Sequence, residues 1–168
     1  MSIGEAIKEY RKANDLTQKD FTGMVPLDRT SLAKIEGAKR KAPKDIMRLT
    51  AIATDDPRIG LAAQEEVSGG ASTPWLNNAD LNKSSVHLKT LEEIGEAYEA
   101  MKLVPITKRK DQLAEKDIHT IQTTIMECIE AITALTHYVA VLCREYTFSW
   151  IAVWKEHRRE LKAKKYLN

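Results

Sequence analysis

The chain has 168 residues, a formal net charge of +2, 43% hydrophobic and 30% charged residues, which suits one or two small folded, soluble domains. No stretch approaches about 18 consecutive apolar residues, so we expect no membrane span, and the amino terminus lacks an apolar signal region. The charge is divided: residues 1–48 carry 11 basic and 7 acidic residues (+4), residues 49–104 carry 4 and 9 (−5), and residues 105–168 carry 11 and 8 (+3).

The first predicted element is a helix over residues 3–13. Ser2 can cap its amino terminus, and Glu5, at the third helical position, completes the pattern of a capping box. Asn14 and Asp15 end it. Its inward face would consist of Ile3, Ala6, Ile7 and Tyr10.

Residues 16–40 are predicted to form two short helices separated by a tight break. Apolar residues three and four apart mark one buried face on each helix. In the break, Pro26 cannot continue the preceding helix, and Asp28 can accept hydrogen bonds from the free N–H groups that open the next. The apolar residues are Phe21, Met24 and Val25 on the first helix and Leu32 and Ile35 on the second.

The second helix of this pair has a polar face that can donate hydrogen bonds. Its residues are Arg29, Thr30, Ser31 and Lys34, and the basic residues Lys39, Arg40, Lys41 and Lys44 follow. Donors on a short helix after a sharp turn, trailed by cations, suit a DNA major groove flanked by phosphates. The alternative is an ordinary solvated face.

The order of residues favours the first interpretation. Residues 2–53 resemble the lambda-repressor-like helix-turn-helix family, the XRE or Cro/phage-repressor regulators. The resemblance rests on Leu16-Thr17-Gln18, on Lys34-Ile35-Glu36, on Lys39-Arg40 and on Pro43 before the fourth helix. The family usually has a small residue where Thr22 stands and glycine where Pro26 stands; proline cannot adopt the positive φ that glycine provides there. The turn must therefore take a different path.

The resemblance implies a five-helix DNA-binding domain and a role for each matching residue. Gln18 would meet a phosphate and brace the recognition helix, and Arg11 would pair with Glu36 inside the domain. The base-reading residues would be Arg29, Thr30, Ser31 and Lys34. The phosphate contacts would come from Thr17, Gln18, Lys39, Arg40, Lys41 and Lys44.

Two more helices complete the predicted domain of residues 1–67. Pro43 opens a fourth helix, and Pro57, after Asp55-Asp56, suits the first turn of a fifth that ends near Val67. The inward residues of the fourth would be Ile46, Leu49, Ile52 and Ala53. Residues 68–85, rich in Gly, Ser and Asn, are predicted to be a linker. Within it, Trp75 would be docked against a helix, with a ligand site as the alternative.

Residues 86–168 are predicted to be a helical, coiled-coil-like oligomerisation domain. The first helix has Leu88, Leu91, Ile94, Tyr98 and Met101 on one face. The second has a heptad seam of Ile118, Ile121, Ile125, Cys128, Ile132, Leu135, Val139 and Leu142. An apolar band this wide, without charges beside it, favours self-association as a dimer or tetramer. The alternative is the core helix of a monomeric bundle. Both cysteines, Cys128 and Cys143, are expected to be free thiols.

A last helix after Ser149 would return against this oligomerisation unit. Trp150 and Trp154 lie one turn apart on its apolar side. Its opposite face is basic and either touches DNA or is simply solvated; its residues are Lys155, Arg158, Arg159, Lys162, Lys164 and Lys165. A small-molecule pocket at the two tryptophans is a third and weaker possibility.

The residue types that a catalytic, metal or cofactor site would require are scattered along the sequence. The four histidines stand singly, the cysteines form no CxxC pair, and no glycine-rich phosphate loop is present. We therefore expect no enzyme, no metal and no cofactor. The sequence predicts an all-α, cytoplasmic, homo-oligomeric regulator that binds double-stranded operator DNA, most simply a repressor of a phage or mobile element. The alternative is a protein-interaction module with the same fold, such as an antitoxin-like protein or the target of an anti-repressor.

Overall fold

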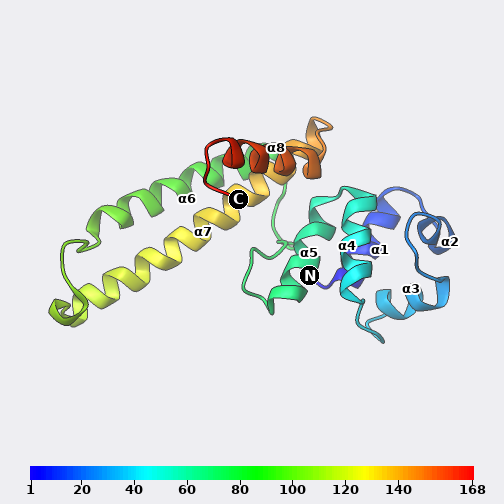
Figure 1. The fold of residues 1–168 in the computed structure, drawn as a ribbon, viewed down its shortest axis with the longest axis horizontal. Coiled ribbons are helices and arrows are strands. Elements are labelled where there is room, and N and C mark those ends of the chain that lie inside the picture. The colour runs from blue at the N-terminus through cyan, green and yellow to red at the C-terminus, as the bar shows by residue number, and fades with distance from the viewer. The chain divides into compact units, whose positions relative to one another are not determined.

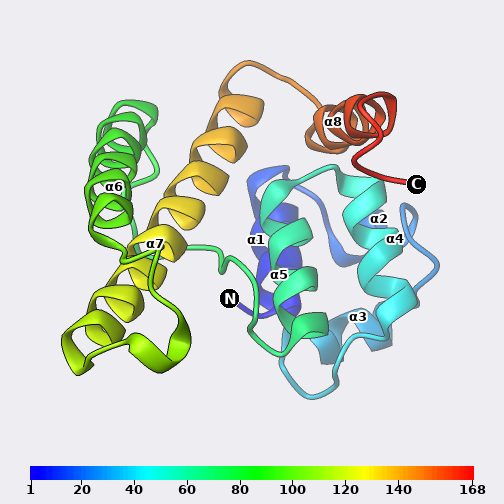
Figure 2. The same ribbon diagram turned by 60° about the vertical axis from the view of Figure 1, so that its left-hand side comes forward.

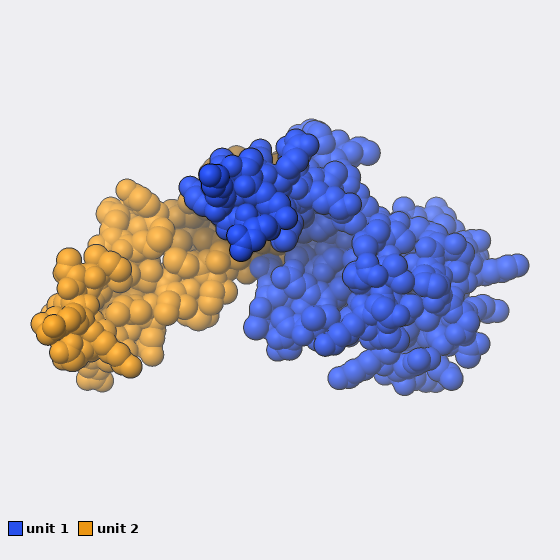
Figure 3. Space-filling model, in the orientation of Figure 1, with its two compact units in different colours: residues 1–78, 146–168 blue, residues 79–145 orange.

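The computed structural model describes residues 1–168 and is entirely helical, with no strand (Figure 1). This confirms the predicted all-α class. The helices are α1 (Ile3–Ala13), α2 (Gln18–Thr22), α3 (Arg29–Glu36), α4 (Lys44–Thr54), α5 (Pro57–Ser68), α6 (Lys83–Leu103), α7 (Glu115–Glu145) and α8 (Trp150–Ala163), with the short 3-10 helix η1 (Lys110–Gln112) before α7. The chain divides into unit 1, residues 1–78 and 146–168, and unit 2, residues 79–145 (Figure 3).

The core of unit 1 is built from the first five helices. Its largest fully buried side chains include Phe21 of α2, Leu32 of α3 and Ile59 of α5, and Ile3 and Ile7 of α1 join them. The predicted capping box of α1 is present: the Ser2 hydroxyl accepts from the Glu5 N–H, and the Glu5 carboxylate accepts from the Ser2 N–H. Local capping and shared apolar faces therefore account for α1 and its neighbours.

The first helix of the α2–α3 pair is shorter than predicted. It ends at Thr22, so Met24 lies in the turn and is 39% exposed, whereas Val25 is buried there. No residue of the turn 23–28 has a positive φ; instead the Leu27 N–H donates to the Val25 carbonyl at 2.8 Å. Pro26 is thus accommodated without the left-handed residue that a glycine would supply.

Gly4 allows α1 to lie directly against the end of α3. A Cβ atom at this position would lie 2.2 Å from the Ile35 carbonyl oxygen, a backbone atom that cannot rotate away. Sequence reasoning gave this residue no role, because a glycine inside a helical pattern normally only lowers helix stability.

Replacing Gly4 by alanine should therefore lower the free energy of unfolding by about 1–3 kcal/mol, the usual cost of overpacking. Urea unfolding followed by circular dichroism measures the change. Gly95→Ala in α6 is the matched control, because a Cβ at Gly95 meets nothing within 4 Å. A Gly4→Ala variant as stable as the wild type would contradict the close approach.

The inward face of α4 differs from the prediction. Ile46 is buried as expected, but Ile52 is 53% exposed and Ala53 is also exposed. Met47 and Thr50 are buried instead. The predicted stripe was therefore wrong toward the carboxyl end of α4, because the face that α4 turns to the core passes through Met47 and Thr50.

The last helix is the main correction to the predicted domain division. Residues 146–168 belong to unit 1, whereas the sequence predicted them as part of the oligomerisation domain of residues 86–168. Asp55, which ends α4 with a left-handed φ of 50°, accepts a hydrogen bond from the Ile151 N–H at 2.7 Å. A Cβ atom at Gly60 would lie 3.3 Å from Nε1 of the buried Trp150. These contacts join positions almost a hundred residues apart, which no local pattern encodes.

Unit 2 is an antiparallel hairpin of α6 and α7 (Figures 1 and 2). Its contacts run in opposite chain directions: His87 Nδ1 lies 3.1 Å from the Tyr138 hydroxyl, and the Thr124 hydroxyl donates to the Ala100 carbonyl. By length and composition alone, α7 would also qualify as a membrane-spanning helix, with a mean hydropathy of 1.5 over the qualifying window. A long helix that packs against other helices has the same composition, so this property does not distinguish the two.

Candidate nucleic-acid interface

The polar face of α3 is exposed as the sequence predicted. Arg29, Thr30 and Lys34 are all exposed, whereas Leu32 and Ile35 of the same helix are buried. Asp28 caps the helix, with its Oδ1 accepting from the Ser31 N–H at 2.9 Å. Hydrogen bonding from the Ser31 side chain, and then from its backbone N–H, lowers the pKa of Asp28 below its ordinary value, so the cap stays ionised at neutral pH.

Ser31 differs from the other predicted base-reading residues, because it is half-buried and already has a partner. Its hydroxyl accepts a hydrogen bond from Arg40 Nη1 at 3.1 Å. Arg40 follows the carboxyl end of α3, and this contact places its guanidinium against the polar face of the helix. Arg40 is thereby held beside α3, where it adds positive charge.

A hydrogen-bonded ion pair braces α3 from behind. Arg11 Nε lies 2.9 Å from Glu36 Oε1, and Arg11 Nη2 donates to Glu36 Oε2 at 3.0 Å. Gln18 Nε2 donates to the same oxygen at 3.0 Å. The pair implied by the family resemblance is thus present, and Gln18 braces the helix through Glu36. Three helices, α1, α2 and α3, meet at this one carboxylate.

Burial and hydrogen bonding act on Glu36 in opposite directions. Its side chain is only 6% exposed, and burial by itself raises its pKa. The hydrogen bonds from Arg11 and Gln18, with the charge of Arg11, outweigh burial and hold the pKa of Glu36 below its ordinary value. The carboxylate is therefore ionised in the folded domain, and the brace remains intact at neutral pH.

An open hollow lies between the end of α1, the start of α2 and the start of α3. Its volume is about 630 Å³, and its lining includes Lys12, Gln18, Lys19 and Arg29. The whole lining has four cationic side chains, one of them the already paired Arg11, and one carboxylate, Asp15, so its net positive charge suits a phosphate group. The Thr17 hydroxyl, at the edge of the hollow, donates to Asp20 Oδ2 in the capping box of α2. The predicted phosphate contact of Thr17 would therefore compete with Asp20 for the same hydroxyl.

The connection after α3 carries exposed cations, although its Ala42 is buried. Lys39, Arg40 and Lys41 lie in the connection, Lys44 opens α4, and all four side chains are exposed. The connection turns at Ala38, which has a φ of 55°, and the Lys39 N–H donates to the Lys34 carbonyl at 2.8 Å. The left-handed residue is therefore Ala38 and not the preceding Gly37, which has a φ of −90°. These cations follow the polar face directly, as phosphate-binding residues beside a groove-reading helix would.

The basic face of α8 lies elsewhere in unit 1. In both ribbon views α8 lies at the end of this unit away from α3 (Figures 1 and 2). Trp154, on its other side, stacks edge-on against Trp150 with ring centroids 5.5 Å apart. The placement favours the simpler interpretation of the α8 cations as a solvated face.

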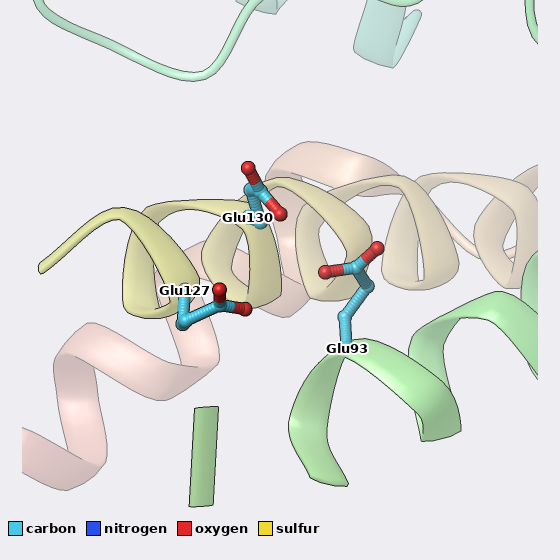
Figure 4. Close-up of side chains that lie close together, drawn as sticks. All are labelled: Glu93, Glu127 and Glu130. Carbon is cyan, nitrogen blue, oxygen red and sulfur yellow. The ribbon is translucent and has the colours of Figure 1, made fainter. Parts of the chain in front are cut away.

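Three carboxylates of the hairpin form the one group of potential metal ligands. Glu93 of α6 and Glu127 and Glu130 of α7 have oxygens within 4.8 Å of one another, with Glu93 reaching toward α7 (Figure 4). Carboxylate oxygens are ligands for Ca²⁺ or Mg²⁺. Lys89 Nζ, however, lies 2.8 Å from Glu93 Oε1 and already supplies a counter-charge. The sequence could not show this group, because its members lie on different helices.

The predicted oligomerisation seam of α7 is largely exposed. Ile118, Ile125, Ile132, Leu135 and Val139 are exposed, and Ile121, Cys128 and Leu142 are half-buried. Both cysteines are free. The predicted face of α6, with Leu88, Leu91, Ile94, Tyr98 and Met101, is exposed as well. The two helices contact each other through other residues, so neither stripe is covered inside unit 2.

No family model, curated protein or solved structure matches this chain. The function must therefore be argued from the site itself. Its two defining features are a braced helix with an exposed polar face and a hairpin with uncovered apolar stripes.

Proposed function

We propose that this chain is a sequence-specific DNA-binding transcriptional regulator of the lambda-repressor-like helix-turn-helix type. The observation that carries the proposal is the pairing of an exposed Arg29, Thr30 and Lys34 with the Arg11–Glu36–Gln18 brace behind them. A reading helix must offer donors to base edges and must also keep a fixed orientation. A merely solvated surface helix needs no such brace.

In this proposal the contacts divide into two kinds. Arg29, Thr30 and Lys34 enter the major groove and discriminate between bases. The cations that follow α3, together with the hollow beside Gln18, contact phosphates and make binding depend on salt. From the family resemblance we also propose that the protein is cytoplasmic and acts as a repressor of a phage or mobile element.

The exposed apolar stripes of unit 2 support action as a homo-oligomer. One reading helix covers only one half-site, and a twofold pair of them reads half-sites about one helical turn apart. Linking two weak readers raises the effective concentration of the second after the first has bound. The oligomer would therefore supply most of the operator affinity.

Two alanine substitutions test the assignment on a duplex selected from random sequence. Arg29→Ala should relax base preference at one position by about 1–3 kcal/mol, roughly 5- to 150-fold in affinity. Lys41→Ala should weaken specific and random duplexes by the same factor and lower the salt dependence. Fluorescence anisotropy at several salt concentrations measures both. If both variants lost only non-specific binding, α3 would not be the reading helix, and absence of any binding at low salt would favour a protein-interaction module.

A further inference from the structure

The hairpin of unit 2 divides its residues in a regular way between three faces. The two helices contact each other through Thr90, Glu93 and Ala97 of α6 and through Thr124 and Ala131 of α7, all of them buried. The Thr90 hydroxyl also lies 3.3 Å from the Ala134 carbonyl. These five residues are small or polar, and Val86 is the one large apolar residue that α6 buries, so the middle of the contact between α6 and α7 buries little apolar surface.

The apolar stripe of α6 lies directly beside this contact face. Leu91, Ile94, Tyr98 and Met101 are between 41% and 57% exposed. Each of them follows a contact-side residue by one position, as Leu91 follows Thr90 and Tyr98 follows Ala97. One residue is a rotation of about 100° around a helix, so the stripe is offset from the contact face by about that angle.

The apolar stripe of α7 has the same offset. Ile118, Ile125, Ile132, Leu135 and Val139 are 37% to 56% exposed. Ile125 follows Thr124, and Ile132 follows Ala131, again by one position. Two antiparallel helices lie in a common plane, and an approximate twofold axis perpendicular to that plane exchanges them. This rotation keeps each side of the plane on the same side. Stripes that are offset from the contact face by the same angle on α6 and α7 therefore lie on one side of the hairpin. We call these nine residues the apolar flank.

Charged residues occupy the opposite side. On α6, Lys89, Glu92 and Glu96 each precede a contact-side residue by one position, and on α7 Glu130 precedes Ala131. On the side of the apolar flank, α7 carries no charged residue from Ile118 to Val139. The hairpin is therefore amphipathic as a whole.

We propose that a second copy of this chain covers the apolar flank, so that two hairpins form a four-helix bundle. The nine side chains, each about half exposed, leave on the order of 800 Å² of apolar surface, which matches the roughly 800 Å² per partner of a standard interface. A helical hairpin that buries so little apolar surface between its own helices needs a second layer. The inference deepens the proposed function by naming the twofold partner of the DNA-reading unit, and it gives α6 an equal share with α7.

The molar mass of the full chain in solution, measured without DNA, tests this pairing. We expect the wild-type chain to have twice its 19.0 kDa and to melt at a temperature that rises with protein concentration. Ile125→Glu should weaken dimerisation at least about 100-fold, because it places a carboxylate in an apolar interface. Thr123→Glu is the matched control: it adds the same charge two residues away at an exposed position on the opposite side.

Tyr98→Glu on α6 should weaken the dimer as Ile125→Glu does, since both stripes contribute. Pairing through α7 alone would leave Tyr98→Glu dimeric and would overturn the proposal. Three further results would overturn the proposal. The first is a monomeric wild type, and the second is an equal effect of Ile125→Glu and Thr123→Glu on dimerisation. The third is flotation of the wild type with vesicles of phosphatidylcholine and phosphatidylglycerol. If the glutamate variants lose helix, the concentration dependence of wild-type melting still decides. None of these readouts uses DNA, so they separate failure of the dimer from failure of DNA binding.

Discussion

Arg11→Ala should destabilise the helices of residues 1–68 by about 3–5 kcal/mol, the usual cost of removing one partner from a buried ion pair. The substitution leaves Glu36, only 6% exposed, without its counter-charge and without two of its hydrogen bonds. It also removes the bond from Arg11 Nη1 to the Leu16 carbonyl at 2.7 Å. The loss is large because an ionised carboxylate would then remain buried among α1, α2 and α3.

Urea unfolding, together with hydrogen exchange of the α1 and α3 amides, measures this loss. Lys12→Ala is the matched control, because Lys12 is exposed on the same helix and has no ion pair in the structure. The double variant Arg11→Met, Glu36→Met should recover most of the stability, since an apolar pair leaves no buried charge. An Arg11→Ala variant within about 0.5 kcal/mol of Lys12→Ala would show that the brace does not hold α3.

The second large effect is expected on operator binding when the apolar flank is disrupted. Ile125→Glu should lower the apparent affinity for a twofold operator by about 10²- to 10⁴-fold, because the second reader is no longer tethered to the first. Its affinity for a duplex with a single half-site should equal that of the wild type, since Ile125 belongs to unit 2 and the proposed reading helix α3 belongs to unit 1. Gel-shift titrations with both duplexes measure the two effects.

The control for this prediction is again Thr123→Glu, which should bind both duplexes as the wild type does. Equal operator affinity for Ile125→Glu and the wild type would mean that each chain reads DNA independently. In that case the dimer, even if it forms, would contribute nothing to recognition.

Local patterns in the sequence were enough to predict most helices and their caps. The Ser2–Glu5 capping box, the Asp28 cap of α3 and the Pro57 start of α5 all depend on residues within a few positions of each other. The burial of Leu32 and Ile35, which leaves the other side of α3 exposed, follows from the same short spacing. Such features are encoded locally, so periodicity and capping rules recover them.

Features that depend on distant segments could not be predicted in this way. The docking of α8 through Asp55 and the close approach of Gly4 to Ile35 join segments far apart in the chain. The hairpin gives the clearest case. Thr90 and Ala97 lie on the face that α6 turns to α7, and no pattern in the sequence marked these two residues as the contact within the hairpin. Hydrophobic spacing identifies an apolar stripe and not the partner that covers it.

The most direct measurement of the central claim is a selection of bound duplexes from a random pool by the intact chain. The account predicts enrichment of an inverted repeat whose half-sites are centred about 10 base pairs, or a multiple of one helical turn, apart. It also predicts that a pool selected by Arg29→Ala loses preference at one symmetric pair of positions. Recovery of a pool with no sequence preference, at a salt concentration where the protein still binds duplex, would contradict the claim that α3 reads DNA as one of a twofold pair.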